Sequence, residues 1–160
     1  MKNLLLYTQK NTMQKKYRIE KIYKEYLSVK ESKTCKWSRV FFFKLFLKKD
    51  IFFLSINKPA EGYLIARKIV DEYEILSLAT DIDKRRKGIG GMLLNKLINK
   101  AKKEKIKRIL LEVSLKNVAA IRMYKKFGFK IIGKRISYYN QASGLTDAYT
   151  MEKKLIKYVE

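Results

Sequence analysis

The first stretch suited to chemistry is a glycine-rich run, Arg85-Arg86-Lys87-Gly88-Ile89-Gly90-Gly91, between an apolar segment and a helical pattern. The backbone amides of such a loop can point together at a phosphate, and a helix N-terminus and basic side chains favour the same charge. The run lacks the Lys-Ser/Thr of a Walker loop and the glycine spacing of a dinucleotide fingerprint. It therefore indicates either a pyrophosphate site of another kind or a basic turn that contains glycines.

A second group of candidates lies downstream and comprises Glu112, Asn117 and Tyr124. Glu112 stands inside an apolar strand pattern, where an ionised carboxylate is costly unless it is hydrated or paired. It is thus a candidate general base, or an outward-facing carboxylate in a salt bridge with a lysine. Tyr124 lies seven residues after Asn117, so one helical face can carry both. A core tyrosine with a satisfied hydroxyl would give the same pattern.

The composition limits which other groups can act. The chain has no histidine and one cysteine, Cys35, so a Ser-His-Asp triad and the usual zinc sites are excluded. We expect no metal, and the acid and base must be carboxylate, tyrosine, lysine, a terminus or water. A lone cysteine cannot form a disulfide within the chain, which favours a reducing, cytoplasmic location. Cys35 lies far from the motifs, and we expect it to be inert.

The charge suggests an anionic partner but does not identify one. The chain has 38 Lys and Arg against 15 Asp and Glu, a net charge of +23. Such a charge attracts RNA, a ribosome surface or an acidic cofactor. The lysines are spread along a chain that is also rich in Ile, Asn, Tyr and Phe, as AT-rich codons would produce, and this pattern favours a compositional origin over a dedicated nucleic-acid surface. No segment resembles a signal peptide or a membrane span, because the apolar runs are short or interrupted by charges.

The periodicity predicts a single mixed α/β domain over residues 1–160, in the order β-α-α-β-β-β-α-β-α-β-β. The last two strands should be separated by a polar, aromatic loop over Ile136–Thr146. We expect helices over Thr12–Leu27, from an N-cap at Ser38 through Phe46, from the glycine run through Ala101, and from Asn117 through Phe127. We expect strands over Lys2–Tyr7, Ile51–Ile56, Tyr63–Val70, Tyr73–Thr80, Ile106–Val113, Lys130–Arg135 and Asp147–Leu155.

Taken together, the motifs resemble the GCN5-related N-acetyltransferase superfamily. The resemblance is carried by Arg-x-x-Gly-x-Gly at Arg85, Asn-x-x-Ala-x-x-x-Tyr from Asn117 to Tyr124, and Phe127-Gly128-Phe129. Other pieces are similar to the ribosomal-protein-alanine N-acetyltransferases (RimI type), which acetylate the N-terminal alanine of ribosomal protein S18. These pieces are Lys36-Trp37-Ser38, Leu111-Glu112-Val113, and Tyr138-Tyr139 followed by Gly144-x-x-Asp147-Ala148-x-x-Met151. The resemblance implies a central mixed sheet flanked by helices.

The resemblance also implies acetyl-coenzyme A as the co-substrate. Its pyrophosphate would lie on the run from Arg85 through Gly91, and its pantetheine arm beside Leu78, Ala79 and Thr80, with Asn117 helping to fix the arm. Glu112 would be the general base and Tyr124 the general acid. The acceptor-side residues implied in the same way are Trp37, Tyr138, Tyr139 and Asp147.

The implied partner is a protein N-terminus, that of S18. We expect the enzyme to be a monomer and to have no membrane partner. Two alternatives remain open. One is an acetyltransferase of the same fold that acts on a small amine or another protein amine. The other is a non-catalytic basic module that binds RNA or the ribosome.

Overall fold

The computed structural model describes the backbone of residues 2–30, 36–141 and 144–155, and within these ranges every side chain except those of 2–12 and 139–141. The helices are α1 (Lys2–Ser28), α2 (Arg39–Phe46), α3 (Ile89–Lys103) and α4 (Val118–Lys126), with a short 3-10 turn, η1, at Ile82–Lys84. The strands are β1 (Ile51–Ile56), β2 (Gly62–Ile69), β3 (Glu72–Thr80), β4 (Arg108–Ser114), β5 (Lys130–Gln141) and β6 (Gly144–Lys154).

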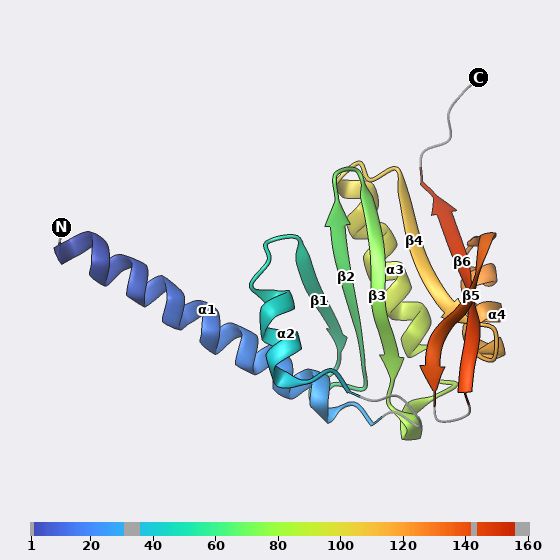
Figure 1. Ribbon diagram of the computed structural model, residues 1–160, viewed down its shortest axis with the longest axis horizontal. Coiled ribbons are helices and arrows are strands. Elements are labelled where there is room, and N and C mark those ends of the chain that lie inside the picture. Colours follow the sequence, from blue (N-terminus) through green and yellow to red (C-terminus); the bar gives the residue numbers. More distant parts are fainter. Residues whose placement is uncertain (1, 31–35, 142–143, 156–160) are drawn as a thin grey trace.

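The strands form one mixed sheet in the order β1-β2-β3-β4-β6-β5. Only β3 and β4 run parallel, and the other neighbours are antiparallel. The parallel register covers Glu72–Ile75 against Arg108–Leu111 and stops there, although both strands continue. The two strands therefore diverge towards their C-terminal ends (Figure 1). This confirms the expected mixed α/β fold.

The core is divided between the two faces of the sheet. Along β2, Leu64 and Ala66 belong to the cluster that contains the buried residues of α3, whereas Tyr63 and Ile65 belong to the cluster that contains those of α1 and α2. Successive strand residues point to opposite faces, so the two clusters lie on opposite sides. We call the face that carries α1 and α2 the first face, and the face that carries α3 and α4 the second face.

The predicted helices are confirmed, and α2, α3 and α4 each start at a residue that explains the start locally. The hydroxyl of Ser38 caps α2 by accepting the amide N–H of Phe41 at 3.2 Å. The side-chain oxygen of Asn117 caps α4 by accepting that of Ala120 at 3.2 Å. Gly88 precedes α3 in the left-handed conformation, with φ of 77° and no side chain to cap the helix.

Two local predictions were wrong. Lys2–Tyr7 is the first part of α1 rather than a strand, and this part of the helix extends away from the sheet (Figure 1). A helix satisfies its backbone within the segment, whereas a strand at this position would need a neighbouring edge. Residues 136–146 are largely strand, because β5 continues to Gln141 and β6 begins at Gly144. Two register shifts let the long hairpin accommodate its irregular sequence.

Candidate active site

The glycine-rich run forms an open helix N-terminus. Arg86 and Gly88 both have positive φ, 65° and 77°, which turns the chain sharply before α3. The amide of Met92 bonds the carbonyl of Gly88 at 2.9 Å, so the amides of residues 89–91 precede the first intrahelical bond. Free amides at a helix start, with basic side chains beside them, form the arrangement that binds phosphate. The residues present therefore fit a pyrophosphate.

The three glycines of the run serve different purposes. A Cβ on Gly88 would meet no heavy atom within 4 Å, so its positive φ explains the residue. A Cβ on Gly90 would lie 2.9 Å from Sδ of Met123, and one on Gly91 would lie 3.1 Å from the ring of Phe127. These two glycines let α3 pack closely against the segment that contains α4. That they serve close approach to a phosphate stays a prediction, and a Cβ at either position would require the neighbouring side chain to shift.

A buried carboxylate holds the segment before the run. Asp81 is 9% exposed and accepts the amide N–H groups of Lys30 and Asp83, each at 3.0 Å. The bond from the Lys30 amide is the main reason that the pKa of Asp81 lies below its usual value. Asp81 therefore ties the end of β3 to the segment after α1. Sequence reasoning missed this residue, although an aspartate whose side chain bonds the backbone two residues on is a familiar turn pattern.

The end of β3 carries the residues predicted to lie beside the pantetheine arm. Ala66 pairs with Ile75 but Ile65 pairs with Ser77, so Leu76 is an extra residue that forms a bulge. Beyond the bulge, Leu78 packs against the second-face cluster and Ala79 against the first-face cluster. Residues 76–80 also lie past the last pair with β4. Their backbone edge is thus open to an extended ligand.

Glu112 lies on the first face, near the divergence of β3 and β4. Its neighbours Leu111 and Val113 belong to the second-face cluster, so alternation along β4 points Glu112 to the other side. The carboxylate is 18% exposed and pairs with the guanidinium of Arg135 at 2.5 Å. A hydrogen bond to Glu112 is the main reason that the pKa of the Tyr138 hydroxyl is raised. The carboxylate is therefore paired, which was one of the two possibilities that the sequence allowed. Its partners are an arginine and a tyrosine rather than the expected lysine.

Tyr124 lies on the second face. It is 6% exposed, belongs to the same cluster as Val113, and its ring meets that of Phe129 edge-on at 5.6 Å. The two candidate catalytic residues thus approach the sheet from opposite sides. A reacting group can reach both only where the strands of the sheet have separated.

Two of the predicted acceptor-side residues, Trp37 and Asp147, make contacts within the chain. Trp37 belongs to the first-face cluster, where it stacks on Tyr26 at 6.0 Å, and its amide donates to the Tyr26 hydroxyl at 2.6 Å. Asp147 pairs with Lys134 at 2.7 Å and accepts the amide N–H of Ser137 at 3.0 Å, and these contacts lower its pKa. Alternation along β6 puts Asp147 on the second face, away from Glu112.

Tyr138 is 46% exposed and joins Glu112, whereas the side chain of Tyr139, like Cys35, lies outside the described residues. Arg135 was missed by sequence reasoning because nothing in the sequence distinguishes it from the other basic residues. Thr146 is 5% exposed, and its hydroxyl is the one buried side-chain polar atom without a hydrogen-bond partner in the described part of the chain. Alternation from Ala148 places Thr146 on the first face.

The sequence matches the model of the Acetyltransferase (GNAT) family over residues 16–129. The chain belongs to this family. It is accordingly an acetyl-CoA-dependent N-acetyltransferase. It is 34% identical over 100 residues to the [Ribosomal protein bS18]-alanine N-acetyltransferase of Escherichia coli K12, a match that covers 62% of this chain and 68% of that protein.

Solved structures agree on the fold. The crystal structure of the ribosomal-protein-S18-alanine N-acetyltransferase from Escherichia coli has a TM-score of 0.69 and 29% identity, covering 79% of this chain and 83% of that one. Ard1 from Thermoplasma volcanium has a TM-score of 0.73 and 25% identity, covering 87% and 94%. The described residues contain no cluster of three or more His, Cys, Asp or Glu that could hold a metal ion. None of the helices in the described ranges is long and apolar enough to cross a membrane.

Proposed function

We propose that this acetyltransferase transfers the acetyl group of acetyl-CoA to the N-terminal alanine of ribosomal protein S18, in the cytoplasm and as a monomer. The observation that carries the proposal is the carboxylate of Glu112, held on the first face beside Tyr138 where β3 and β4 diverge. The S18-alanine acetyltransferase to which the chain is 34% identical supports the choice of acceptor.

The cofactor would bind on the second face and at the strand divergence. The amides of residues 89–91 and the basic groups of Arg85, Arg86 and Lys87 would hold its pyrophosphate. The open edge of residues 78–80 would bond the pantetheine arm as an added strand, and Asn117 would lie along it. In this site the cofactor supplies an activated acetyl group.

The acceptor would approach from the first face, where Trp37, Tyr138 and Tyr139 would shape its path. The buried hydroxyl of Thr146 offers a further polar group there. An α-amine has a pKa of about 8, so its ammonium form gives up a proton to a carboxylate, directly or through water. Glu112 would take that proton.

The neutral amine nitrogen would then bond to the acetyl carbon and release its second proton to water, and the carbon–sulfur bond would break. The hydroxyl of Tyr124 would give its proton to the departing sulfur. The amide near Ala79 would polarise the carbonyl oxygen. Asp147 would meet the acceptor only by giving up its contacts with Lys134 and the Ser137 amide, which now occupy its carboxylate.

The test compares acetyl transfer to a peptide with the S18 N-terminus and to a polyamine. We expect the peptide to be acetylated faster, and Glu112→Gln to lower turnover by about 10²-fold. Tyr124→Phe should lower turnover while cofactor binding stays nearly intact. Faster acetylation of the polyamine would replace S18 with a small amine as the acceptor.

The high charge motivates a further proposal, contact with ribosomal RNA, which would bring a basic enzyme to a basic substrate. Binding of RNA with a steep salt dependence would support that contact. If RNA bound in this way while no acceptor were acetylated, a non-catalytic RNA-binding role would be the better interpretation. The mass of S18 from cells with and without this protein would identify the acceptor, since one acetyl group is the expected difference.

A further inference from the structure

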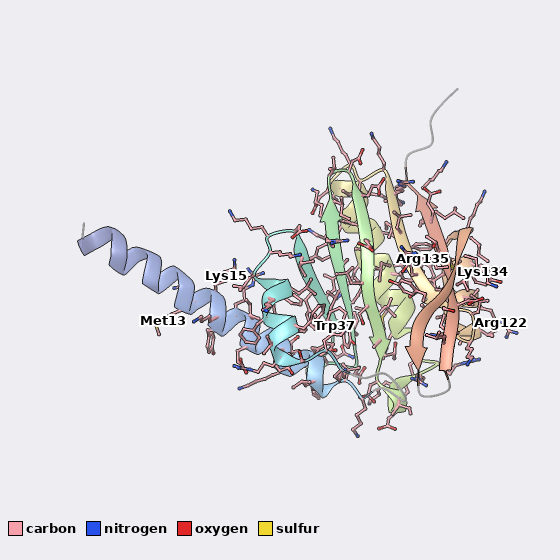
Figure 2. The ribbon with its side chains drawn as sticks, viewed as in Figure 1. Met13, Lys15, Trp37, Arg122, Lys134 and Arg135 are labelled. Carbon is pink, nitrogen blue, oxygen red and sulfur yellow. The ribbon has the colours of Figure 1, made fainter. Side chains whose placement is uncertain are left out.

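The proposed base is already paired with a cation of its own chain. Nη1 of Arg135 lies 2.5 Å from Oε1 of Glu112. The two residues are on strands that are not neighbours, because β6 lies between β4 and β5. Arg135 is opposite Ala148, and Glu112 is opposite Thr150, so the arginine crosses β6 beside a small side chain to reach the carboxylate. Figure 2 shows Arg135 on β5, at the end of the sheet away from α1.

The same arginine makes a second contact, with the ring of Tyr138. Its guanidinium lies 5.0 Å from the centre of the Tyr138 ring, within the range of a cation–π contact. Tyr138 in turn hydrogen-bonds Glu112. Carboxylate, guanidinium and phenol therefore form one cluster, in which the arginine touches both other members.

The exposure of the pair is uneven. The Glu112 side chain is 18% exposed, whereas that of Arg135 is 57% exposed. A carboxylate in this position keeps its place while the arginine can move into water at little cost, since half-exposed ion pairs are weak. The cluster is thus built to exchange one cation for another.

An acceptor α-ammonium is such a cation. It carries the same charge as a guanidinium and donates hydrogen bonds to the same carboxylate oxygens. It cannot deliver its proton to Oε1 of Glu112 while Arg135 occupies that oxygen. An amine that takes this position must first replace the arginine.

We propose that Arg135 occupies the place of the acceptor's ammonium on Glu112 and acts as an internal competitor that the acceptor displaces. The inference rests on the proposed function, because it assumes that Glu112 receives the amine. The displaced guanidinium keeps its contact with the Tyr138 ring. A small free amine has only its charge with which to compete, whereas a peptide gains further contacts along the first face. The competitor therefore favours peptides over small amines.

The test measures equilibrium binding of peptides by calorimetry, in the presence of coenzyme A without an acetyl group. The probes are a hexapeptide that starts with alanine and the same peptide with an acetylated N-terminus. We compare wild type with Arg135→Gln and with Lys130→Gln, which removes an exposed charge from the same strand. Lys130→Gln should change nothing.

Arg135→Gln should tighten binding of the free-amine peptide by about two- to fivefold, the range that an exposed ion pair contributes, and leave the acetylated peptide unchanged. Unchanged or weaker binding of the free-amine peptide would overturn the inference, as would equal tightening of both peptides. A parallel turnover assay separates the two ideas. If wild type showed the expected binding pattern but no acetyl transfer, the proposed function would be wrong. The proposal that Arg135 competes with an ammonium for Glu112 would still hold.

Discussion

Gly62 lies where the sheet meets the start of α3, and its replacement by alanine tests the packing beneath the proposed cofactor site. A Cβ there would lie 2.7 Å from Cγ2 of Ile89 and 2.9 Å from the backbone oxygen of Ala79. Ile89 is the first residue of α3, and a backbone oxygen in a paired strand cannot rotate away. Something in the site must therefore shift to admit one methyl group.

The expected cost of Gly62→Ala is about 1–3 kcal/mol, the usual penalty for overpacking a core. For a domain of this size that corresponds to a fall in melting temperature of roughly 3–9 °C. The displaced groups belong to the helix start at residues 89–91 and to the strand edge at residues 78–80, which we expect to bind the pyrophosphate and the pantetheine arm. Binding of coenzyme A should therefore weaken as well.

Gly133→Ala is the matched control, because it adds the same methyl group to another strand of the same sheet. Its Cβ would approach Thr150 no closer than 3.9 Å, and the residue has no positive φ. We expect it to be neutral, or to stabilise the protein by up to about 1 kcal/mol. Urea unfolding and titration with coenzyme A, measured on both variants, would decide. A Gly62→Ala protein as stable as the Gly133→Ala protein would refute the packing argument.

Three further predictions concern single residues. Glu104 accepts hydrogen bonds from two lysines and from Tyr73, which hold its pKa at about 2 against an ordinary 4.5, so its contribution is complete above about pH 4.5 and lost as pH falls towards 2. At 30% exposure, Glu104→Gln should cost about 1–2 kcal/mol at pH 7 and almost nothing near pH 2 in urea unfolding; an equal loss at both pH values would contradict this. Gly88→Ala should cost about 1 kcal/mol through its φ of 77° alone, and a stable variant would refute that strain. Asn117→Ala should lose about 1 kcal/mol as a missing helix cap, while Asn117→Ser should keep most of it in the same assay.

The helices and most strands could be predicted because each has a local signal. Ser38 and Asn117 are capping residues placed before apolar periodicity, and the structure uses both as caps. The segment at Lys2–Tyr7 contains a short continuous apolar run, which shows neither strand nor helix periodicity, and its prediction as a strand was wrong. Strands at Lys130–Arg135 and Asp147–Leu155 were predicted, but their extension to Gln141 and from Gly144 was missed because this polar, aromatic sequence gives no regular alternation. Its pairing depends on register shifts that only the neighbouring strand determines.

The candidate site likewise contains residues that could be predicted from the sequence and residues that could not. The glycine run could be located because its residue types are unusual, and Glu112 because a carboxylate in an apolar strand needs a reason. The role of Arg135 could not be found, since its significance depends on crossing a strand that comes later in the sequence. The packing of Gly90 against Met123 was equally invisible, because it joins two helices that are separated by a strand.

The division of the core into two clusters bears on how such an enzyme can diverge. The second face holds the helices around the proposed pyrophosphate site, and the first face holds α1, α2 and, on β4, the side chain of Glu112. Substitutions on the two faces share few neighbours, so their effects should add rather than conflict. Selection can therefore reshape the surface that meets the acceptor, through α1, α2 and the β5–β6 hairpin, without rebuilding the other half. A chimaera that takes its residues before β2 from a relative with another acceptor should keep its affinity for the cofactor and change its preferred amine.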